Sequence, residues 1–247
     1  MWDAYNLRMK NALVTGGTKG IGFAVVKMLL SLGYHVVITY SHDEEAAKTC
    51  KAELIKKYTS FEILKASQNI KEEMTSLVQH IAILGTIDCI VCNAGTTLRK
   101  DLRDITNEDW ENVMNVNVNS NVYLIRDLYS YIPSNSRIIF IGSLMGIHPH
   151  GTSLAYGVTK SAVHALCKNL VKCFEGTNTT VNAIAPGFVE TEWQKNKPLE
   201  IRNNIYDKTA IKRFASVDEI ADAVRFCIQN PFVNGSVIEV SGGYSFK

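Results

Sequence analysis

Short apolar runs alternate with longer, more polar stretches along almost the whole chain. The short runs are rich in β-branched residues and are bounded by glycine or polar clusters, which is typical of strands. We predict strands at residues 11–15, 35–40, 61–66, 87–92, 137–141, 180–185 and 236–240. The longer stretches predict helices at residues 21–32, 43–57, 71–83, 107–131, 153–174 and 217–228.

This order of elements predicts an α/β fold. A strand followed by a helix of more than ten residues leads to a right-handed crossover and a parallel neighbour. The strands at 87–92 and 137–141 are apolar almost throughout, as strands covered on both faces must be. We therefore predict a single doubly wound Rossmann domain over residues 1–247, with about seven parallel strands and helices on both faces.

The stretch from 186 to 216 departs from the alternation and reads as irregular. It follows the carboxyl end of a strand, which is where parallel sheets place their ligands. We expect a mobile substrate lid around residues 188–214.

Composition narrows the class of protein. The chain has 247 residues, 46% of them hydrophobic and 20% charged, which is ordinary for a soluble globular protein. Lys+Arg 26 against Asp+Glu 24 gives a net charge of +2, too even for a nucleic-acid or membrane-binding surface. No secretory signal or membrane-spanning run is visible, so we expect a cytoplasmic protein with no nucleic-acid or membrane partner.

Two possible metal or redox motifs have simpler explanations. Cys89 and Cys92 lie three residues apart on a predicted strand, so their side chains point to opposite faces and read as buried apolar groups. His148 and His150 have no third ligand nearby in the sequence. We expect no metal site.

A glycine-rich segment, TGGTKGIG, joins the first predicted strand to the first predicted helix. Glycine lets the backbone approach a pyrophosphate closely, and the helix N-terminus offers unpaired N–H groups. No Gly-Lys-Ser/Thr triplet follows, which excludes a P-loop. The alternative is a tight turn with no ligand. The candidate cofactor-binding residues here are Gly16, Thr18, Lys19, Gly20, Ile21 and Gly22.

The end of the second predicted strand bears on the choice of cofactor. An acidic residue there would accept a hydrogen bond from the adenosine ribose 2′-OH and repel a 2′-phosphate. This chain has Tyr40, Ser41 and His42 there, with no carboxylate before Asp43, and Lys19 adds a cation. We expect NADP(H) to be favoured over NAD(H). The alternative is that Lys19 is a solvated surface charge and Ser41–His42 a plain turn.

Tyr156 and Lys160 lie four residues apart on a predicted helix and therefore on one face. A neighbouring ammonium favours the ionised form of a phenol, which otherwise has a pKa near 10. Ser143 follows a strand's carboxyl end, where its hydroxyl can donate to a developing alkoxide. Asn117 is a polar residue among valines on a predicted helix and, taken alone, reads as an ordinary hydrogen-bonded residue.

Taken together, these motifs resemble the short-chain dehydrogenase/reductase family in order and spacing. The resemblance extends from about residue 11 to 245. Its motifs are Thr15-Gly-x-x-x-Gly20-x-Gly22, Asn93-Ala94-Gly95, Asn117, Ser143, Tyr156-x-x-x-Lys160 and Pro186-Gly187.

The resemblance implies a role for each catalytic candidate. Tyr156 would be the general acid in reduction, and Ser143 would hold the substrate carbonyl. Lys160 would bind the nicotinamide ribose and lower the tyrosine's pKa, and Asn117 would support a water relay to Lys160.

The resemblance also assigns the remaining cofactor contacts and an assembly. Asn93, Ala94 and Gly95 would flank the adenosine ribose, and Pro186, Gly187, Val189 and Thr191 would line the nicotinamide side. A homotetramer would be built on the helices at 107–131 and 153–174 and the last strand.

Within the family the chain most resembles bacterial 3-oxoacyl-[acyl-carrier-protein] reductases, which implies a 3-oxoacyl thioester substrate and an acyl carrier protein as a possible partner. Those enzymes usually carry basic residues at the positions of 133–136 and 174–178, and only Lys168 and Lys172 remain near them here. A dehydrogenase or reductase of a sugar, cyclic alcohol or other small ketone is the alternative, and a non-catalytic dinucleotide-binding regulator is a further one.

Overall fold

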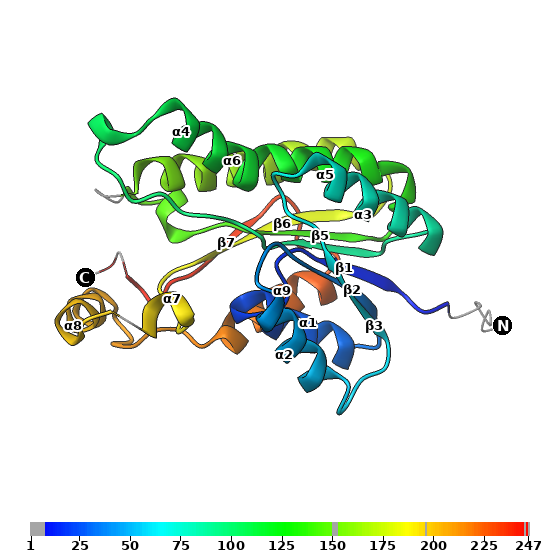
Figure 1. Cartoon of the computed structure of the whole chain (residues 1–247), viewed down its shortest axis with the longest axis horizontal. Coiled ribbons are helices and arrows are strands. Elements are labelled where there is room, and N and C mark those ends of the chain that lie inside the picture. Colours follow the sequence, from blue (N-terminus) through cyan, green and yellow to red (C-terminus); the bar gives the residue numbers. More distant parts are fainter. Residues whose placement is uncertain (1–7, 150–152, 196, 245, 247) are drawn as a thin grey trace.

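The computed structural model describes residues 8–149, 153–195, 197–244 and 246. These residues form one seven-stranded parallel sheet in the order β3-β2-β1-β4-β5-β6-β7 (Figure 1). The strands are β1 (Asn11–Val14), β2 (His35–Tyr40), β3 (Phe61–Lys65), β4 (Cys89–Cys92), β5 (Arg137–Ile141), β6 (Thr180–Pro186) and β7 (Val237–Val240). The predicted α/β fold and all seven predicted strands are confirmed, with ends that differ by at most two residues.

Helices cover both faces of the sheet (Figure 1). One face carries α1 (Gly20–Ser31), α2 (Glu44–Leu54) and α9 (Val217–Gln229). The other carries α3 (Lys71–Leu84), α4 (Asn107–Met114), α5 (Ser120–Leu128) and α6 (Leu154–Cys173). The sheet is therefore doubly wound, as predicted.

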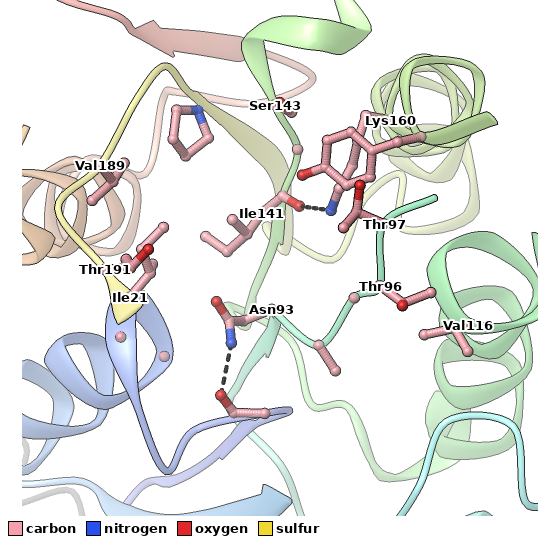
Figure 2. A pocket seen from close by; sticks show the side chains of 18 of the residues that line it. Ile21, Asn93, Thr96, Thr97, Val116, Ile141, Ser143, Lys160, Val189 and Thr191 are labelled. Carbon is pink, nitrogen blue, oxygen red and sulfur yellow. Dashed lines mark hydrogen bonds between the residues drawn. The ribbon is translucent and has the colours of Figure 1, made fainter. Parts of the chain in front are cut away.

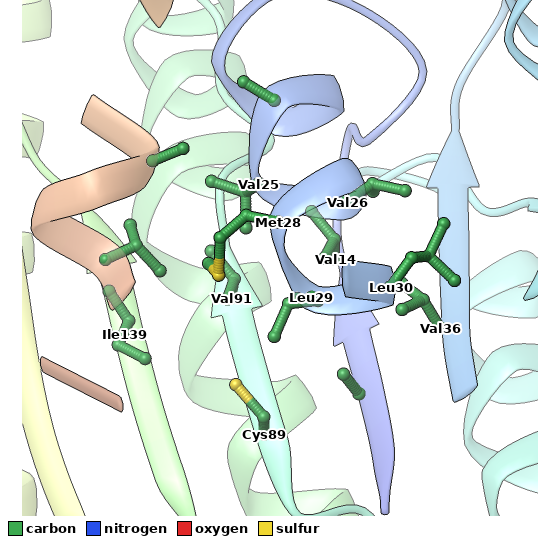
Figure 3. Packing of buried hydrophobic residues seen from close by; sticks show 14 of the residues in the cluster. Val14, Val25, Val26, Met28, Leu29, Leu30, Val36, Cys89, Val91 and Ile139 are labelled. Atoms are coloured by element: carbon green, nitrogen blue, oxygen red, sulfur yellow. The ribbon is translucent and has the colours of Figure 1, made fainter. Parts of the chain in front are cut away.

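A separate hydrophobic core lies on each face of the sheet. Figure 3 shows α1 seated over β1 and β4, with Leu29 and Met28 facing Val14 and Val91. Cys89 belongs to this core, whereas Cys92, on the same strand, belongs to the core on the opposite face. The prediction that these two cysteines point to opposite faces as buried apolar groups is confirmed.

The strand order places a crevice at the carboxyl ends of β1 and β4. The chain leaves β1 for α1 on one face and β4 for α4 on the other, so the connections diverge between these two neighbouring strands. Parallel sheets bind ligands at such a switch point. The segments that contain the candidate functional residues begin at the carboxyl ends of the strands. The exception is the segment between α4 and α5, which contains Asn117.

Two segments differ from the sequence prediction. The helix expected at 107–131 is interrupted by a π-helical segment, Asn115–Asn119, between α4 and α5. The stretch 186–216 is not irregular throughout, because it contains α7 (Glu192–Lys195) and α8 (Leu199–Lys208). Helix α8 starts after Pro198 and carries an acidic residue in its first turn and Lys208 in its last, which are typical signals of helix ends. The helix was not predicted because its sequence is mostly polar. Asn196 lies outside the described residues.

Among the described residues, no helix is long and apolar enough to cross a membrane.

Candidate active site

A cleft of about 560 Å³ lies at the carboxyl ends of the central strands. It is lined by each of the predicted cofactor-binding residues and by Ser143, Tyr156 and Lys160. In Figure 2, Ile21, Val189 and Thr191 lie on one side of this cleft, and Lys160, Thr97 and Val116 lie on the other. Of the candidates, Asn117 alone does not line the cleft.

Two glycines of the glycine-rich turn lie where the backbone is packed too closely for side chains. A Cβ at Gly22 would lie 2.3 Å from the carbonyl oxygen of Gly16, and one at Gly16 would lie 3.1 Å from Cα of Ala94. Helix α1 begins here, and the side chain of its N-cap residue, Lys19, makes no capping hydrogen bond. The first N–H groups of the helix therefore face the cleft free to bind an anion.

Asn93 connects this turn to β4. Its Nδ2 donates to the carbonyl oxygens of Thr15 (3.0 Å) and Gly16 (2.9 Å), and its backbone N–H donates to Oγ1 of Thr15 (3.0 Å). The backbone N–H of Ala94 donates to the same hydroxyl at 3.0 Å. One of these bonds is drawn in Figure 2. The candidate residues Asn93 and Ala94 thus hold the floor of the cleft in place.

The cation expected beside a 2′-phosphate has an acidic partner in the structure. Nζ of Lys19 lies 2.6 Å from Oδ2 of Asp43, and this hydrogen bond holds the pKa of that carboxyl below its usual range. Asp43 also caps α2 by accepting from the N–H of Ala46 (3.0 Å). Ser41 donates to Oγ of Ser67, which follows β3, at 2.8 Å. Tyr40, Ser41, His42 and Lys19 all border the cleft at this end.

Lys160 is buried and points toward the end of β5. Its Nζ donates to the carbonyl oxygen of Ile141 at 2.7 Å (Figure 2) and lies 5.5 Å from the centroid of the Tyr156 ring. Burial lowers the pKa of Lys160 to about 8.

Burial raises the pKa of Tyr156, and a hydrogen bond with Ser143 opposes that rise. In this structure the Lys160 ammonium is directed at a backbone carbonyl. The lowering of the tyrosine's pKa by Lys160 stays a prediction.

Asn117 lies in the π-helical segment and stabilises the wall of the cleft without lining it. Its Oδ1 accepts from the N–H of Thr96 (2.8 Å), and its Nδ2 donates to the carbonyl of Thr96 (2.9 Å) and to Oγ1 of Thr159 (3.0 Å). Its own carbonyl accepts from Nδ2 of Asn121 at 2.8 Å. These bonds connect the loop after β4 to α6 one residue before Lys160. The water relay through Asn117 stays a prediction.

The residues after β6 form the opposite wall. Pro186 ends the strand, and a Cβ at Gly187 would lie 2.9 Å from Cα of Ser241, so the chain can pass β7 only without a side chain there. Val189 forms an isolated bridge with Ala215. Thr191 lies next to the glycine-rich turn, since a Cβ at Gly20 would contact its Cγ2 at 3.6 Å.

The expected absence of a metal site concerns His148 and His150. His148 borders the cleft, and its Nε2 lies 3.9 Å from Oε2 of Glu239, whereas His150 lies outside the described residues. Within the described ranges there is no group of three or more His, Cys, Asp or Glu side chains that could hold a metal ion.

His164 supports Ser143 and is not among the residues predicted from the sequence. Its ring is buried, and Nε2 accepts a hydrogen bond from the backbone N–H of Ser143 at 3.4 Å. The ring fits against Gly142 and Gly146, where added Cβ atoms would lie 2.1 and 2.9 Å from it. Burial and the nearby Lys160 lower its pKa to about 4. The available signal was the spacing of Tyr156, Lys160 and His164 at i, i+4 and i+8, which puts all three on one face of α6.

Comparisons with known proteins agree with this architecture. Residues 10–201 match the family model described as short chain dehydrogenase. The chain is 32% identical over 245 residues to the 3-oxoacyl-[acyl-carrier-protein] reductase of Chlamydia muridarum, covering 95% of this chain and 96% of that protein. It is 30% identical over 249 residues to the short-chain dehydrogenase/reductase SDRA of Arabidopsis thaliana, covering 96% and 95%.

A solved structure is similarly close. The short chain dehydrogenase from Burkholderia cenocepacia in complex with NADP superposes with a TM-score of 0.88 at 26% identity, covering 95% of this chain and 97% of that one. The chain belongs to the short-chain dehydrogenase family. It is an oxidoreductase that acts on CH–OH or C=O groups, and its fold binds a nicotinamide dinucleotide.

We predict that Gly22→Ala weakens NADPH binding at least tenfold. The new Cβ would lie 2.3 Å from the Gly16 carbonyl, so the turn must open and the N–H groups that face the pyrophosphate must move. The dissociation constant can be measured by the fluorescence of bound NADPH. Ser31→Ala, at the far end of α1, is the matched control. An unchanged dissociation constant for Gly22→Ala would show that this turn does not hold the cofactor.

We predict that the protein loses stability relative to His164→Gln as the pH falls from about 6.5 to about 4. The unfolded chain protonates this histidine near pH 6.5, whereas the folded protein does so only near pH 4. Between these values the unfolded state binds more protons, so acid favours unfolding. Glutamine cannot titrate and keeps an acceptor for the Ser143 N–H. Urea midpoints across this range test the prediction, which fails if the difference between the two proteins does not change with pH.

Proposed function

We propose that this protein is an NADPH-dependent ketone reductase whose leading substrate is a 3-oxoacyl thioester. The observation that supports this most is the meeting of Ser143, Tyr156 and Lys160 in the cleft that also contains the glycine-rich turn. The similarity to a 3-oxoacyl-[acyl-carrier-protein] reductase favours the thioester among the possible ketones.

In this proposal, the side chains of Tyr156 and Ser143 act on the substrate oxygen. The bound nicotinamide supplies the hydride to the carbonyl carbon. Tyr156 donates its proton to the carbonyl oxygen, and its raised pKa keeps the phenol protonated at neutral pH. Ser143 donates a hydrogen bond to the same oxygen and stabilises the charge that develops there.

Lys160 and Asn117 act one step away from the substrate. With its pKa at about 8, the ammonium of Lys160 remains mostly charged at neutral pH and would bind the nicotinamide ribose hydroxyls. Asn117 holds the wall beside it through Thr96 and Thr159. We also propose that Asn117 supports the chain of waters that returns a proton to Tyr156.

The preference for NADPH is proposed from the groups at the adenosine end of the cleft. Lys19, Ser41 and His42 would contact the 2′-phosphate, and Tyr40, Asn93, Ala94 and Gly95 would surround the adenosine. The carboxylate nearest to them, Asp43, is already paired with Lys19 and serves as the N-cap of α2. A structural relative is bound to NADP.

A pair of variants tests the cofactor preference. Lys19→Gln removes the cation, so we expect the ratio of kcat/KM for NADPH over NADH to fall about tenfold. Asp43→Asn removes the competing carboxylate and keeps an N-cap, so the same ratio should rise. Steady-state rates with both cofactors measure the effect. If both variants leave the ratio unchanged, the 2′-phosphate does not bind here.

The reductase proposal is tested by NADPH oxidation with acetoacetyl thioesters, beside a panel of sugars and cyclic ketones. We expect thioester turnover that prefers NADPH and is lost by at least a thousandfold in Tyr156→Phe, which removes only the proton donor. The Tyr156→Phe variant should still bind NADPH, because its ring remains in place. Thioester turnover that survives in Tyr156→Phe would overturn the role of this tyrosine.

A second candidate function is the reduction or oxidation of a sugar, cyclic alcohol or other small ketone. The segments at 133–136 and 174–178 contain no lysine or arginine with which to meet an acidic carrier protein, and Lys168 and Lys172 are the basic residues that remain near them. Such a face would steer an acidic partner weakly. Activity only on sugars or cyclic ketones would favour this second candidate. Binding of NADPH with no turnover of any substrate would favour a non-catalytic regulator.

We further propose a cytoplasmic homotetramer, with an acyl carrier protein as its possible partner. Apolar side chains of α5 and α6 remain exposed in the single chain, among them Val122, Tyr123, Leu154 and Val158. Burial of these faces against further copies would remove that apolar surface from water. Together with β7 they would form the contacts of the tetramer.

A further inference from the structure

A second cavity of about 190 Å³ adjoins the cleft beneath the lid helix α8. It shares part of its lining with the main cleft, including Met145 and Ser153. Met145 follows Ser143 by two residues, and Ser153 precedes Tyr156 by three. A substrate whose carbonyl lies between Ser143 and Tyr156 can therefore extend directly into this second cavity.

The charged residues that line this cavity are all basic. Arg99 comes from the loop after β4, Lys197 from the segment between α7 and α8, and Lys208 from the end of α8. Of the residues that the structure describes, no carboxylate lines it. Among the described residues, none of these three side chains has an ion pair or a side-chain hydrogen bond with a neighbour.

Other cations of the lid region are paired, which sets these three apart. Arg202 lies 2.5 Å from Glu190, and Arg213 lies 2.6 Å from Glu219. Lys195, two residues before Lys197, pairs with Glu192. In the described part of the lid region, Arg202, Arg213 and Lys195 thus have carboxylate partners, whereas the three cations that line the cavity have none.

Two of the unpaired cations, Arg99 and Lys197, are near enough for their charges to interact. Lys197 is partly buried, and both this burial and the charge of Arg99 lower its pKa. Arg99 is exposed and Lys197 is half-buried. Their like charges repel each other, and an anion between them would relieve that repulsion. Beside them, Ile201, Ile205 and Phe188 provide an apolar surface for a carbon skeleton.

We propose that this cavity is a subsite for an anionic group, a carboxylate or a phosphate, carried by the substrate away from its reacting carbonyl. This inference rests on the proposed reductase function and narrows its substrate to an anionic ketone or thioester. Arg99 and Lys197 bind the anion by charge-assisted hydrogen bonds, and Lys208 closes the subsite from α8.

Matched substrates test the subsite. Acetoacetyl-coenzyme A and acetoacetyl-N-acetylcysteamine share the reacting group, and only the first carries phosphate. Levulinate and methyl levulinate differ by one carboxylate. We expect kcat/KM to be at least about tenfold higher for the charged member of one pair, mainly through KM, because a remote contact binds ground and transition states alike. A preference within the levulinate pair identifies the anion as a carboxylate. Acetoacetyl-coenzyme A also carries pantothenate and adenosine parts, so a preference within that pair is assigned to phosphate only when the double variant described next removes it.

Variants connect that preference to these residues. The double variant Arg99→Gln/Lys197→Gln should bring the ratio between charged and uncharged substrates close to one. Lys56→Gln, which changes an exposed lysine just after α2 that does not line the cavity, is the matched control and should keep the ratio.

The outcomes separate this inference from the function on which it rests. Equal kcat/KM for the two members of both pairs would overturn the anionic subsite and leave the reductase proposal standing. A preference for charged substrates that persists in the double variant would place the anion elsewhere and also overturn the subsite. If neither member of either pair is reduced while NADPH still binds, the thioester and ketone reductase proposal itself fails.

Discussion

The close packing of the turn after β1 against the end of β4 is the constraint on which the site depends. Gly16 and Gly22 allow the turn to fold onto itself, and Asn93 fastens it to the neighbouring strand with two bonds from one amide. The strands β1 to β3 lie on one side of the crevice and β4 to β7 on the other. The hydrogen bonds of Asn93 therefore hold the two halves of the sheet together at the crevice. The packing of this turn also determines where α1 begins and therefore where its free N–H groups lie.

The catalytic wall depends on a second set of buried polar contacts. Three groups on one face of α6 are each held from another element: Tyr156 by Ser143, Lys160 by the Ile141 carbonyl, and His164 by the Ser143 N–H. Buried polar groups carry a large cost when they are unpaired, so these contacts fix the rotation of α6 relative to β5. Burial at this place also lowers the pKa of Lys160 to about 8.

The sequence was sufficient to predict the sheet, the glycine-rich turn and the residues that meet in the cleft. The sheet and the glycine-rich turn follow from local periodicity, and the place of Ser143 follows from the rule that carboxyl ends of parallel strands lie at one edge. The contacts of Asn93, Ala94 and Gly95 and of the residues from Pro186 to Thr191 came only from the family resemblance. The Lys19–Asp43 pair could not be predicted, because its partners are 24 residues apart and meet only through the side-by-side packing of two turns. The direction of Lys160 was missed for the same reason, since the acceptor is a backbone carbonyl on another element.

The π-helical segment Asn115–Asn119 has a consequence for the phase of the long helical region. A π-turn holds one residue more than an α-turn, and one residue corresponds to about 100° of rotation along a helix. The segment therefore acts as an inserted residue that resets α5 relative to α4. Without it, Leu124, Ile125 and Leu128 would rotate out of the core while α4 stayed in place. The one extra residue thus allows α4 and α5 to form one continuous helical region while each packs in its own orientation. Asn117 lies in the segment where the orientation changes.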